Sequence, residues 1–255
     1  MGWLKLKEVD ALPIDSPERT ILHGEVIRSK HFLKRLYIEW YQLLKGAVSY
    51  HDDGTYIELG SGAGFVKELM PSVTTSDVME LPGVDKVFYA ESIPFGASSV
   101  DGIIMIDVLH HIPAPESFFK EASRVLKPGG RIVMSEPWNS MFGRFIYKNF
   151  HHEPFDPDGG WTIPSTGPLS GANGALPWIL FERDRKDFEK KFPELVIKTI
   201  KLHTPFRYLL SGGVSMKQLV PNFLFKPITF LEKIVTSRYL NMFALIVIEK
   251  RDSRG

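Results

Sequence analysis

The sequence predicts an α/β fold in which helices surround a mostly parallel, doubly wound sheet. Three observations support this prediction: short apolar runs typical of buried parallel strands, helical periodicity between several of these runs, and a glycine-rich turn directly after the first run. A length of 255 residues is within the range of one α/β unit. We therefore expect a single domain over residues 1–255.

Residues 18–50 are expected to form a helical arm ahead of the sheet. Apolar side chains recur there at three- and four-residue spacings, which is typical of amphipathic helices; they include Ile21, Leu22, Val26, Phe32, Leu36, Ile38, Leu43 and Leu44. Turn-forming residues at 51–54 separate this arm from the first apolar run. One or two helices are therefore predicted before the sheet begins.

The core of the sheet is predicted over residues 55–136. Strands are expected at 56–59, 73–76, 86–89, 100–106 and 131–135. A helix is expected at 114–126, where it is ended by a Lys-Pro-Gly-Gly sequence. The stretch between the second and third strands is too short for a full crossover helix, so this side of the sheet is expected to be abbreviated.

The C-terminal third departs from regular strand and helix alternation. A helix is predicted at 184–192 and strands at 195–203 and 242–250. Two insertions remain, 137–180, rich in Gly, Pro and aromatic residues, and 204–240, rich in Phe, Leu and Pro. Long connections inside a compact domain usually serve function, so we expect both insertions to cap a substrate site.

Composition limits the kinds of partner. Lys and Arg number 31 and Asp and Glu 30, which leaves a net charge of +1 and argues against a nucleic-acid substrate. The sequence has no cysteine, which excludes disulfides, thiolate metal sites and a cysteine nucleophile. No apolar run reaches the roughly 18 residues of a spanning helix, and residues 1–10 lack a secretory signal pattern. A cytoplasmic location is expected.

The glycine turn is the strongest local signal. Gly60 and Gly62 allow a sharp turn and a close approach of the backbone to a ligand, but such a turn could bind a dinucleotide, a nucleoside or nothing. The dinucleotide pattern fails, because Phe65 stands where the third glycine belongs. Asp77 ends the second strand, where an acidic side chain can accept ribose hydroxyls; its alternative role is to cap a turn.

Further motifs occur in a fixed order along the core. They are Glu-Leu-Gly-Ser-Gly-Ala-Gly at 58–64, Glu-Ser-Ile-Pro-Phe at 91–95, Ser-Val-Asp at 99–101, Asp-Val-Leu-His-His-Ile at 107–112, Glu-Ala-Ser-Arg-Val-Leu-Lys-Pro-Gly-Gly at 121–130, and Glu-Pro-Trp at 136–138. Together they resemble the ubiquinone-biosynthesis-type group of class I S-adenosylmethionine-dependent methyltransferases. This resemblance implies a seven-stranded, Rossmann-like sheet with an antiparallel last strand.

The resemblance also implies S-adenosylmethionine as cofactor and S-adenosylhomocysteine as product, with residues 55–136 as the cofactor-binding core. Carried over by position, the cofactor-binding residues are Glu58, Gly60, Ser61, Gly62, Asp77, Val78, Tyr89, Ala90, Glu91, Asp107 and Val108. The family usually places an Asp at the position of Tyr89 to bind the adenine amino group. Adenine recognition is therefore expected to use stacking on Tyr89 or backbone contacts instead.

Methyl transfer from a sulfonium requires mainly that donor and acceptor be held in line. An oxygen acceptor also benefits from a general base, for which His152 and His111 are the candidates and Glu136 an alternative. His111, like His110, could instead be structural. The segment His-His-Glu at 151–153 could be a base, a metal cluster or a solvated loop; because adjacent histidines on an extended loop point apart, no metal site is expected.

Residues 220–240 carry an apolar stripe with two interpretations: a helix packed on the core, or an apolar lid or membrane-contacting surface over the acceptor. We expect O-methylation of a small-molecule, lipid-linked or saccharide-like acceptor, with peripheral membrane contact as an option. Two alternatives are a non-catalytic cofactor-binding module and, less favoured, a nicotinamide-dependent oxidoreductase. The sequence gives no expectation for the oligomeric state.

Overall fold

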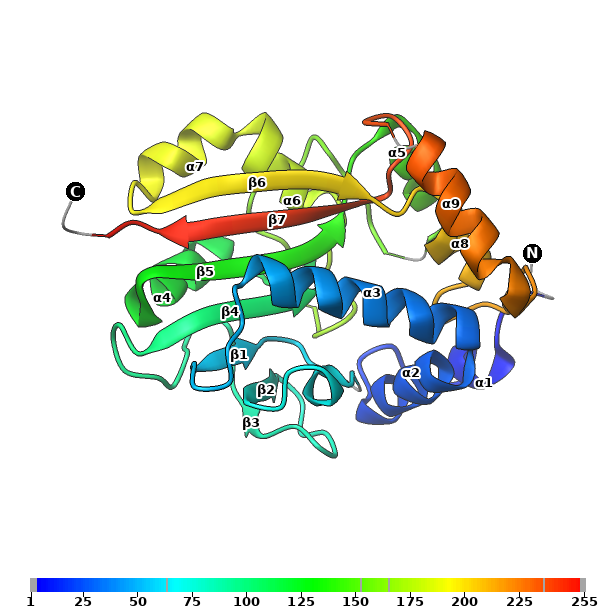
Figure 1. Ribbon diagram of the computed structural model, residues 1–255, viewed down its shortest axis with the longest axis horizontal. Coiled ribbons are helices and arrows are strands. Elements are labelled where there is room, and N and C mark those ends of the chain that lie inside the picture. Colours follow the sequence, from blue (N-terminus) through cyan, green and yellow to red (C-terminus); the bar gives the residue numbers. More distant parts are fainter. Residues whose placement is uncertain (1–3, 63, 152, 165, 236, 253–255) are drawn as a thin grey trace.

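The computed structural model describes residues 4–62, 64–151, 153–164, 166–235 and 237–252 (Figure 1). Its seven-stranded sheet has the order β3-β2-β1-β4-β5-β7-β6, and β7 runs antiparallel to both of its neighbours. The strands are β1 Tyr56–Glu58, β2 Val73–Asp77, β3 Lys86–Val87, β4 Val100–Ile106, β5 Leu126–Pro137, β6 Leu195–His203 and β7 Phe243–Lys250. The predicted α/β sheet with an antiparallel last strand is confirmed.

Helices cover both faces of this sheet, as Figure 1 shows for α3 on one face and α4 and α7 on the other. The α-helices are α1 Lys7–Asp10, α2 Pro17–Ser29, α3 His31–Ala47, α4 Pro115–Val125, α5 Met141–Phe150, α6 Leu176–Trp178, α7 Arg185–Lys191, α8 Arg207–Ser211 and α9 Phe225–Val235. Shorter turns are η1 Val66–Glu68, η2 Leu109–His111, the π-helical η3 Ile179–Arg183, and η4 Asn222–Leu224.

Alternate residues of the central strands serve the two faces, as the two-residue period of a strand requires. On β4, Ile103 and Met105 pack with Phe119 of α4 in one cluster. Ile104 between them packs with Leu44 of α3 in a second cluster. Because both faces are apolar, these strands appear in the sequence as continuous apolar runs.

The N-terminal arm forms two helices, as predicted. Ser16 caps α2 by accepting a hydrogen bond from the backbone N–H of Arg19 at 3.2 Å, and Pro17 stands at the first helical position, where it is well tolerated. The chain turns at Lys30 and continues as α3. The guanidinium of Arg28 donates to the carbonyl of Gly64 at 2.8 Å, which ties α2 to the glycine turn.

The described residues between the glycine turn and the parallel strand β2 form a single turn, η1, rather than a long helix. The arm covers this face instead: Leu33 of α3 packs in the same cluster as Phe65 and Met70. The connection from β2 to β3 is also abbreviated, as expected.

The second insertion contains α9, which packs on the core along one side only. Phe225 is buried with its ring 4.8 Å from that of Phe32, centroid to centroid. Phe230 is 68% exposed and Ile234 65% exposed. The prediction of a helix packed on the core therefore holds for Phe225 but not for the face of α9 that carries Phe230 and Ile234. In the described part of the chain, no helix is long and apolar enough to cross a membrane.

Candidate functional site

A cavity lies at the carboxyl ends of β1, β4 and β5, the edge at which open α/β sheets bind ligands. Its floor includes Glu58 and Asp107, which end or follow two adjacent parallel strands. Its walls come from α2, α3, α5 and the segment after α8. The cavity thus connects the predicted cofactor turn to the arm and both insertions.

Gly60 and Gly62 have φ of +58° and +53°, a left-handed conformation that side-chain-bearing residues rarely adopt. A Cβ on Gly60 would lie 2.6 Å from Cγ2 of Val108, so Gly60 is required by the close approach of the loop after β4. A Cβ on Gly62 would make ordinary contacts, at 3.5 Å with Thr20 of α2 and at 3.9 Å with the carbonyl oxygen of Gly60. Gly60 therefore lies against the loop after β4 and Gly62 beside α2, and both line the cavity.

Asp77 holds the glycine turn in place. Its carboxylate accepts hydrogen bonds from the backbone N–H of Gly62 at 2.9 Å and from that of Met79 at 3.0 Å. Burial raises the pKa of this carboxyl group, and the backbone donors oppose that rise. The turn-capping role considered for Asp77 is therefore the one seen in the structure.

Glu58 presents an unpartnered carboxylate oxygen to the cavity. Ser61 and Tyr41 hydrogen-bond to its carboxyl group, but Oε2 has no hydrogen-bond partner among the described residues. Burial raises its pKa to about 7. Thr20 Oγ1 and Asp107 Oδ1 line the same cavity and are likewise buried without a hydrogen-bond partner in the described part of the chain. Buried polar atoms are normally satisfied, so these three atoms fit a ligand rich in hydroxyl and ammonium donors.

Asp107 is backbone-strained as well as buried. It follows β4 with φ of +56°, a conformation uncommon for residues other than glycine. Burial raises the pKa of its carboxyl group to about 8, although the nearby positive charge of His110 opposes that rise. Strained residues persist where the surrounding structure holds them in place, and they cluster at functional sites.

Glu136, at the end of β5, anchors the loop after β4. Its Oε1 accepts hydrogen bonds from the backbone N–H groups of Val108 and Leu109, both at 2.8 Å. Its Oε2 lies 2.7 Å from Nδ1 of His110, and the residue is fully buried. Because both oxygens are engaged inside the protein, the alternative assignment of Glu136 as a general base is wrong.

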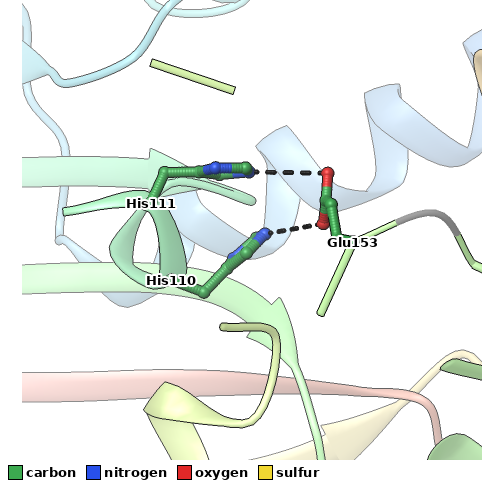
Figure 2. Close-up of side chains that lie close together, drawn as sticks. All are labelled: His110, His111 and Glu153. Carbon is green, nitrogen blue, oxygen red and sulfur yellow. Dashed lines mark ion pairs between the residues drawn. The ribbon is translucent and has the colours of Figure 1, made fainter. Parts of the chain in front are cut away.

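Glu153, from the first insertion, meets both histidines of η2. Figure 2 shows its carboxylate facing the two rings, with Oε2 3.3 Å from Nε2 of His110 and Oε1 3.6 Å from Nε2 of His111. Burial disfavours a charged imidazole at both positions. Hydrogen bonds to the carboxylates of Glu136 and Glu153 nevertheless raise the pKa of His110 to about 10, whereas that of His111 falls to about 4.

The predicted site residues divide into two groups. Those that line the cavity are Glu58, Gly60, Ser61, Gly62, Asp107 and His111. Those that lie outside its lining are Asp77, Val78, Tyr89, Ala90, Glu91 and Val108. Tyr89 is 66% exposed, so its ring is open to a planar partner. His152 falls outside the described residues.

Sequence reasoning missed two sets of cavity residues. Four tyrosines line the cavity: Tyr41 of α3 and Tyr147 of the first insertion are buried, and Tyr37 of α3 and Tyr208 of the second insertion are partly buried. The four-residue spacing of Tyr37 and Tyr41 could have signalled a shared helix face. No sequence pattern predicted the contact of Glu153 with the histidines of η2, because Glu153 lies in an irregular connection.

Comparisons with known proteins agree with this architecture. Residues 57–134 match a family model described as a methyltransferase domain. An uncharacterized 37.1 kDa protein in a transposon of Streptomyces fradiae is 43% identical over 51 residues. That match spans 20% of this chain and 15% of the relative's length.

Two solved structures share the fold. A chain in the Haloferax volcanii complex of the Trm112 methyltransferase activator with a methyltransferase has a TM-score of 0.53 at 13% identity, covering 95% of this chain and 99% of its own. A protein from Pyrococcus horikoshii has a TM-score of 0.51 at 16% identity, with coverages of 86% and 92%. Geranyl diphosphate C-methyltransferase from Streptomyces coelicolor scores 0.49 at 16% identity, with coverages of 88% and 82%.

Residues 57–134 therefore match a methyltransferase domain, and the chain as a whole shares the fold of the two solved structures. Dependence on S-adenosylmethionine, which the ordered motifs predict, is a proposal for this chain. The ubiquinone-biosynthesis-type subgroup stays a prediction.

Proposed function

We propose that the enzyme methylates an oxygen atom of a small, largely apolar acceptor bound beneath the two insertions. The observation that carries this proposal is one continuous cavity, in which the glycine turn and the pair of His111 and Glu153 are both part of the lining. A donor site and a proton-accepting group in one cavity meet the two requirements of O-methylation.

The proposed cofactor, S-adenosylmethionine, supplies a methyl group on a positively charged sulfur. In this proposal Glu58 and Thr20 offer their unpartnered oxygens to its polar end, beside Gly60, Ser61 and Gly62. Asp77 accepts from the ribose hydroxyls through lone pairs that the backbone leaves unused. The exposed ring of Tyr89 stacks on the adenine, flanked by Val78, Ala90 and Glu91, while Asp107 and Val108 border the donor site.

His111 is the proposed proton acceptor. A low pKa keeps its imidazole neutral near pH 7. Its Nδ1 lies 3.1 Å from the carbonyl oxygen of Gly171, so Nδ1 carries the proton and Nε2 keeps a lone pair. That lone pair can take the proton of an acceptor hydroxyl in the cavity. His152 stays the second candidate from the sequence.

The apolar character of the acceptor is inferred from the insertions. Ile146, Tyr147 and Phe150 of α5 line the cavity. The outer faces of α5 and α9, which Figure 1 places at the same end of the molecule, expose large apolar side chains; these are Met141, Phe145, Phe150, Phe230, Leu231 and Ile234. Exposed apolar patches commonly mark interaction sites. A lipid-linked acceptor, collected by peripheral contact with a membrane, fits this arrangement.

A labelled-methyl turnover screen with hydroxylated apolar acceptors tests the proposal. We expect transfer to oxygen by the wild-type protein, a severe loss of turnover in His111→Asn, and unchanged turnover in the exposed control His31→Asn. Calorimetry with S-adenosylhomocysteine should show similar affinity for all three proteins. Transfer to carbon or nitrogen only, or full activity of His111→Asn, would overturn the assignment of the acceptor atom or of the base.

A further inference from the structure

We propose that His110, His111 and Glu153 form a binding site for a divalent transition-metal ion of the zinc type. In the part of the chain that the structure describes, one ligand atom from each of these residues lies within 4.8 Å of the others (Figure 2). The residues come from η2 and from the first insertion, 42 positions apart in the sequence, so the cluster exists only in the fold. The sequence alone led to the opposite expectation.

The separations suit a shared ion. Two ligand atoms that are each about 2.0–2.1 Å from one ion, at a tetrahedral angle, lie about 3.3 Å apart. Glu153 Oε2 is 3.3 Å from His110 Nε2, and Glu153 Oε1 is 3.6 Å from His111 Nε2. The two rings lie side by side, with centroids 4.2 Å apart. A shared ion therefore requires side-chain rotations that draw together three ligand atoms that now lie within 4.8 Å of one another.

The outer nitrogen of each histidine supplies independent support. His110 Nδ1 is 2.7 Å from the Glu136 carboxylate, and His111 Nδ1 is 3.1 Å from the Gly171 carbonyl. Metal-ligating histidines almost always donate their second N–H to a carboxylate or a carbonyl. These contacts direct both Nε2 atoms toward Glu153 and fix the rings.

A second independent feature is a buried carboxyl group, on the cavity that the cluster lines, with an oxygen that has no hydrogen-bond partner among the described residues. This oxygen is Oδ1 of Asp107. His151 also lines the cavity, with its Nδ1 3.6 Å from Oε2 of Glu153. Two imidazoles with one carboxylate favour zinc-like ions, whereas magnesium and calcium prefer ligand sets made only of oxygen.

Three protein ligands leave an open coordination position, the pattern of catalytic rather than structural zinc sites. The cluster lines the cavity, so that position is reachable by a hydroxyl or another oxygen donor of an acceptor. Ligation of an ion would occupy the Nε2 atom that the proposed function uses as proton acceptor, so the base role of His111 belongs to the metal-free protein. The metal site goes beyond the proposed function and stands whether or not the acceptor is methylated on oxygen.

Cobalt and zinc titrations of the untagged, chelator-dialysed protein test the site. We expect one equivalent of Co²⁺ to bind, with the intense visible absorption of a four- or five-coordinate ion, and Zn²⁺ to displace it. Mg²⁺ at the same concentration should not compete. Glu153→Gln and His111→Asn should each weaken Co²⁺ binding at least tenfold, while the surface controls Glu189→Gln and His31→Asn leave it unchanged.

Glu136→Gln tests the orienting contact separately and should lower the affinity for Co²⁺ by about 10- to 100-fold. Circular dichroism and S-adenosylhomocysteine affinity, measured on every variant, distinguish a lost metal site from a lost fold or a lost cofactor site. Absence of saturable binding by the folded wild-type protein overturns the proposal. So does Co²⁺ affinity that Glu153→Gln and His111→Asn both leave unchanged in folded protein.

Discussion

Glu136 lies 2.7 Å from Nδ1 of His110 through Oε2, and the same carboxylate accepts the backbone N–H groups of Val108 and Leu109 through Oε1. One buried side chain at the end of β5 therefore fixes the backbone and the first histidine of the loop that follows β4. The positions of Asp107 and His111, which flank these contacts, depend on that anchor.

Glu136→Gln should lower the free energy of unfolding by about 1–3 kcal/mol, because the amide cannot satisfy all three donors that the carboxylate accepts. Urea denaturation at a fixed pH measures the change. Glu189→Gln, on the exposed side of α7, is the matched control and should change stability by less than about 0.5 kcal/mol. Equal stability of the two variants would show that the anchor is dispensable.

The sheet could be predicted from sequence because each central strand is apolar on both faces. The bounds of β4 at 100–106 and of β6 at 195–203 agree with prediction to the residue. Between β1 and β2 the described residues form only the turn η1, and helix α3 packs beside it. Periodicity in the arm predicted its helices but not which part of the sheet they would cover.

The cofactor side of the site was accessible from sequence through the family resemblance, which assigned Glu58 and Asp107 to it. Both residues lie on the same cavity, because they end or follow adjacent parallel strands. Glu153 could not be placed, since an irregular connection, unlike a strand, has no period that fixes where its side chains point. The contact of Glu153 with His110 and His111 is consequently a finding of the structure alone.

Glu58 should make stability depend on pH. Its pKa is raised from 4.5 to about 7 in the folded protein, which therefore keeps a proton that the unfolded chain has released. The contribution of this group to stability is greatest below about pH 4.5, declines as the pH rises toward 7, and is constant above that value. The total decline is about 3 kcal/mol, at about 1.4 kcal/mol per pKa unit.

Glu58→Gln keeps the shape of the side chain and removes the titration, so the difference in stability between this variant and wild type should grow from pH 5 to pH 8 in favour of the variant. Urea denaturation at several pH values between these limits provides the measurement. Asp53→Asn, in the exposed turn before β1, is the control. A difference that stays constant with pH would mean that Glu58 is ionised in the folded protein throughout.

Gly60→Ala and Gly62→Ala should differ in stability. Each places a side-chain-bearing residue in the left-handed region, at a cost of about 1–2 kcal/mol. Gly60→Ala also forces its Cβ against Val108, which adds about 1–3 kcal/mol of overpacking. Thermal or urea denaturation should therefore rank Gly62→Ala as the more stable variant.

The double variant Gly60→Ala, Val108→Ala is the control for the contact with Val108. Removal of the two Val108 methyl groups should restore much of the stability that the contact with the new Cβ costs. A double variant no more stable than Gly60→Ala would assign the whole effect to backbone conformation.

Asp77→Ala should weaken S-adenosylhomocysteine binding by about 1–3 kcal/mol, through loss of a charged acceptor and of the bond that holds Gly62. Asp77→Asn keeps an oxygen for one donor and should lose less. Isothermal titration calorimetry measures both, with Asp53→Ala as the control. A loss below a few tenths of a kcal/mol in Asp77→Ala would place the ribose contact elsewhere.

The outer face of α9 is predicted to bind a membrane surface, from which the enzyme would take its acceptor. Phe230 and Ile234 are 68% and 65% exposed, and Lys226 and Lys233 are exposed on the same helix. Burial of one such apolar side chain in a bilayer interface contributes about 1.5–3 kcal/mol, and each nearby lysine adds about 1 kcal/mol at an anionic surface. Phe230→Ser with Ile234→Ser should therefore reduce binding to anionic phosphatidylglycerol vesicles at least tenfold in a sedimentation assay, yet leave the free energy of unfolding within about 0.5 kcal/mol of wild type.

Val87→Ser, which changes an exposed residue on the edge strand β3, is the control and should change neither quantity. Wild-type binding should weaken as salt is added. Wild-type protein that stays in the supernatant at low salt would contradict the membrane contact and leave an acceptor that diffuses freely to the cavity.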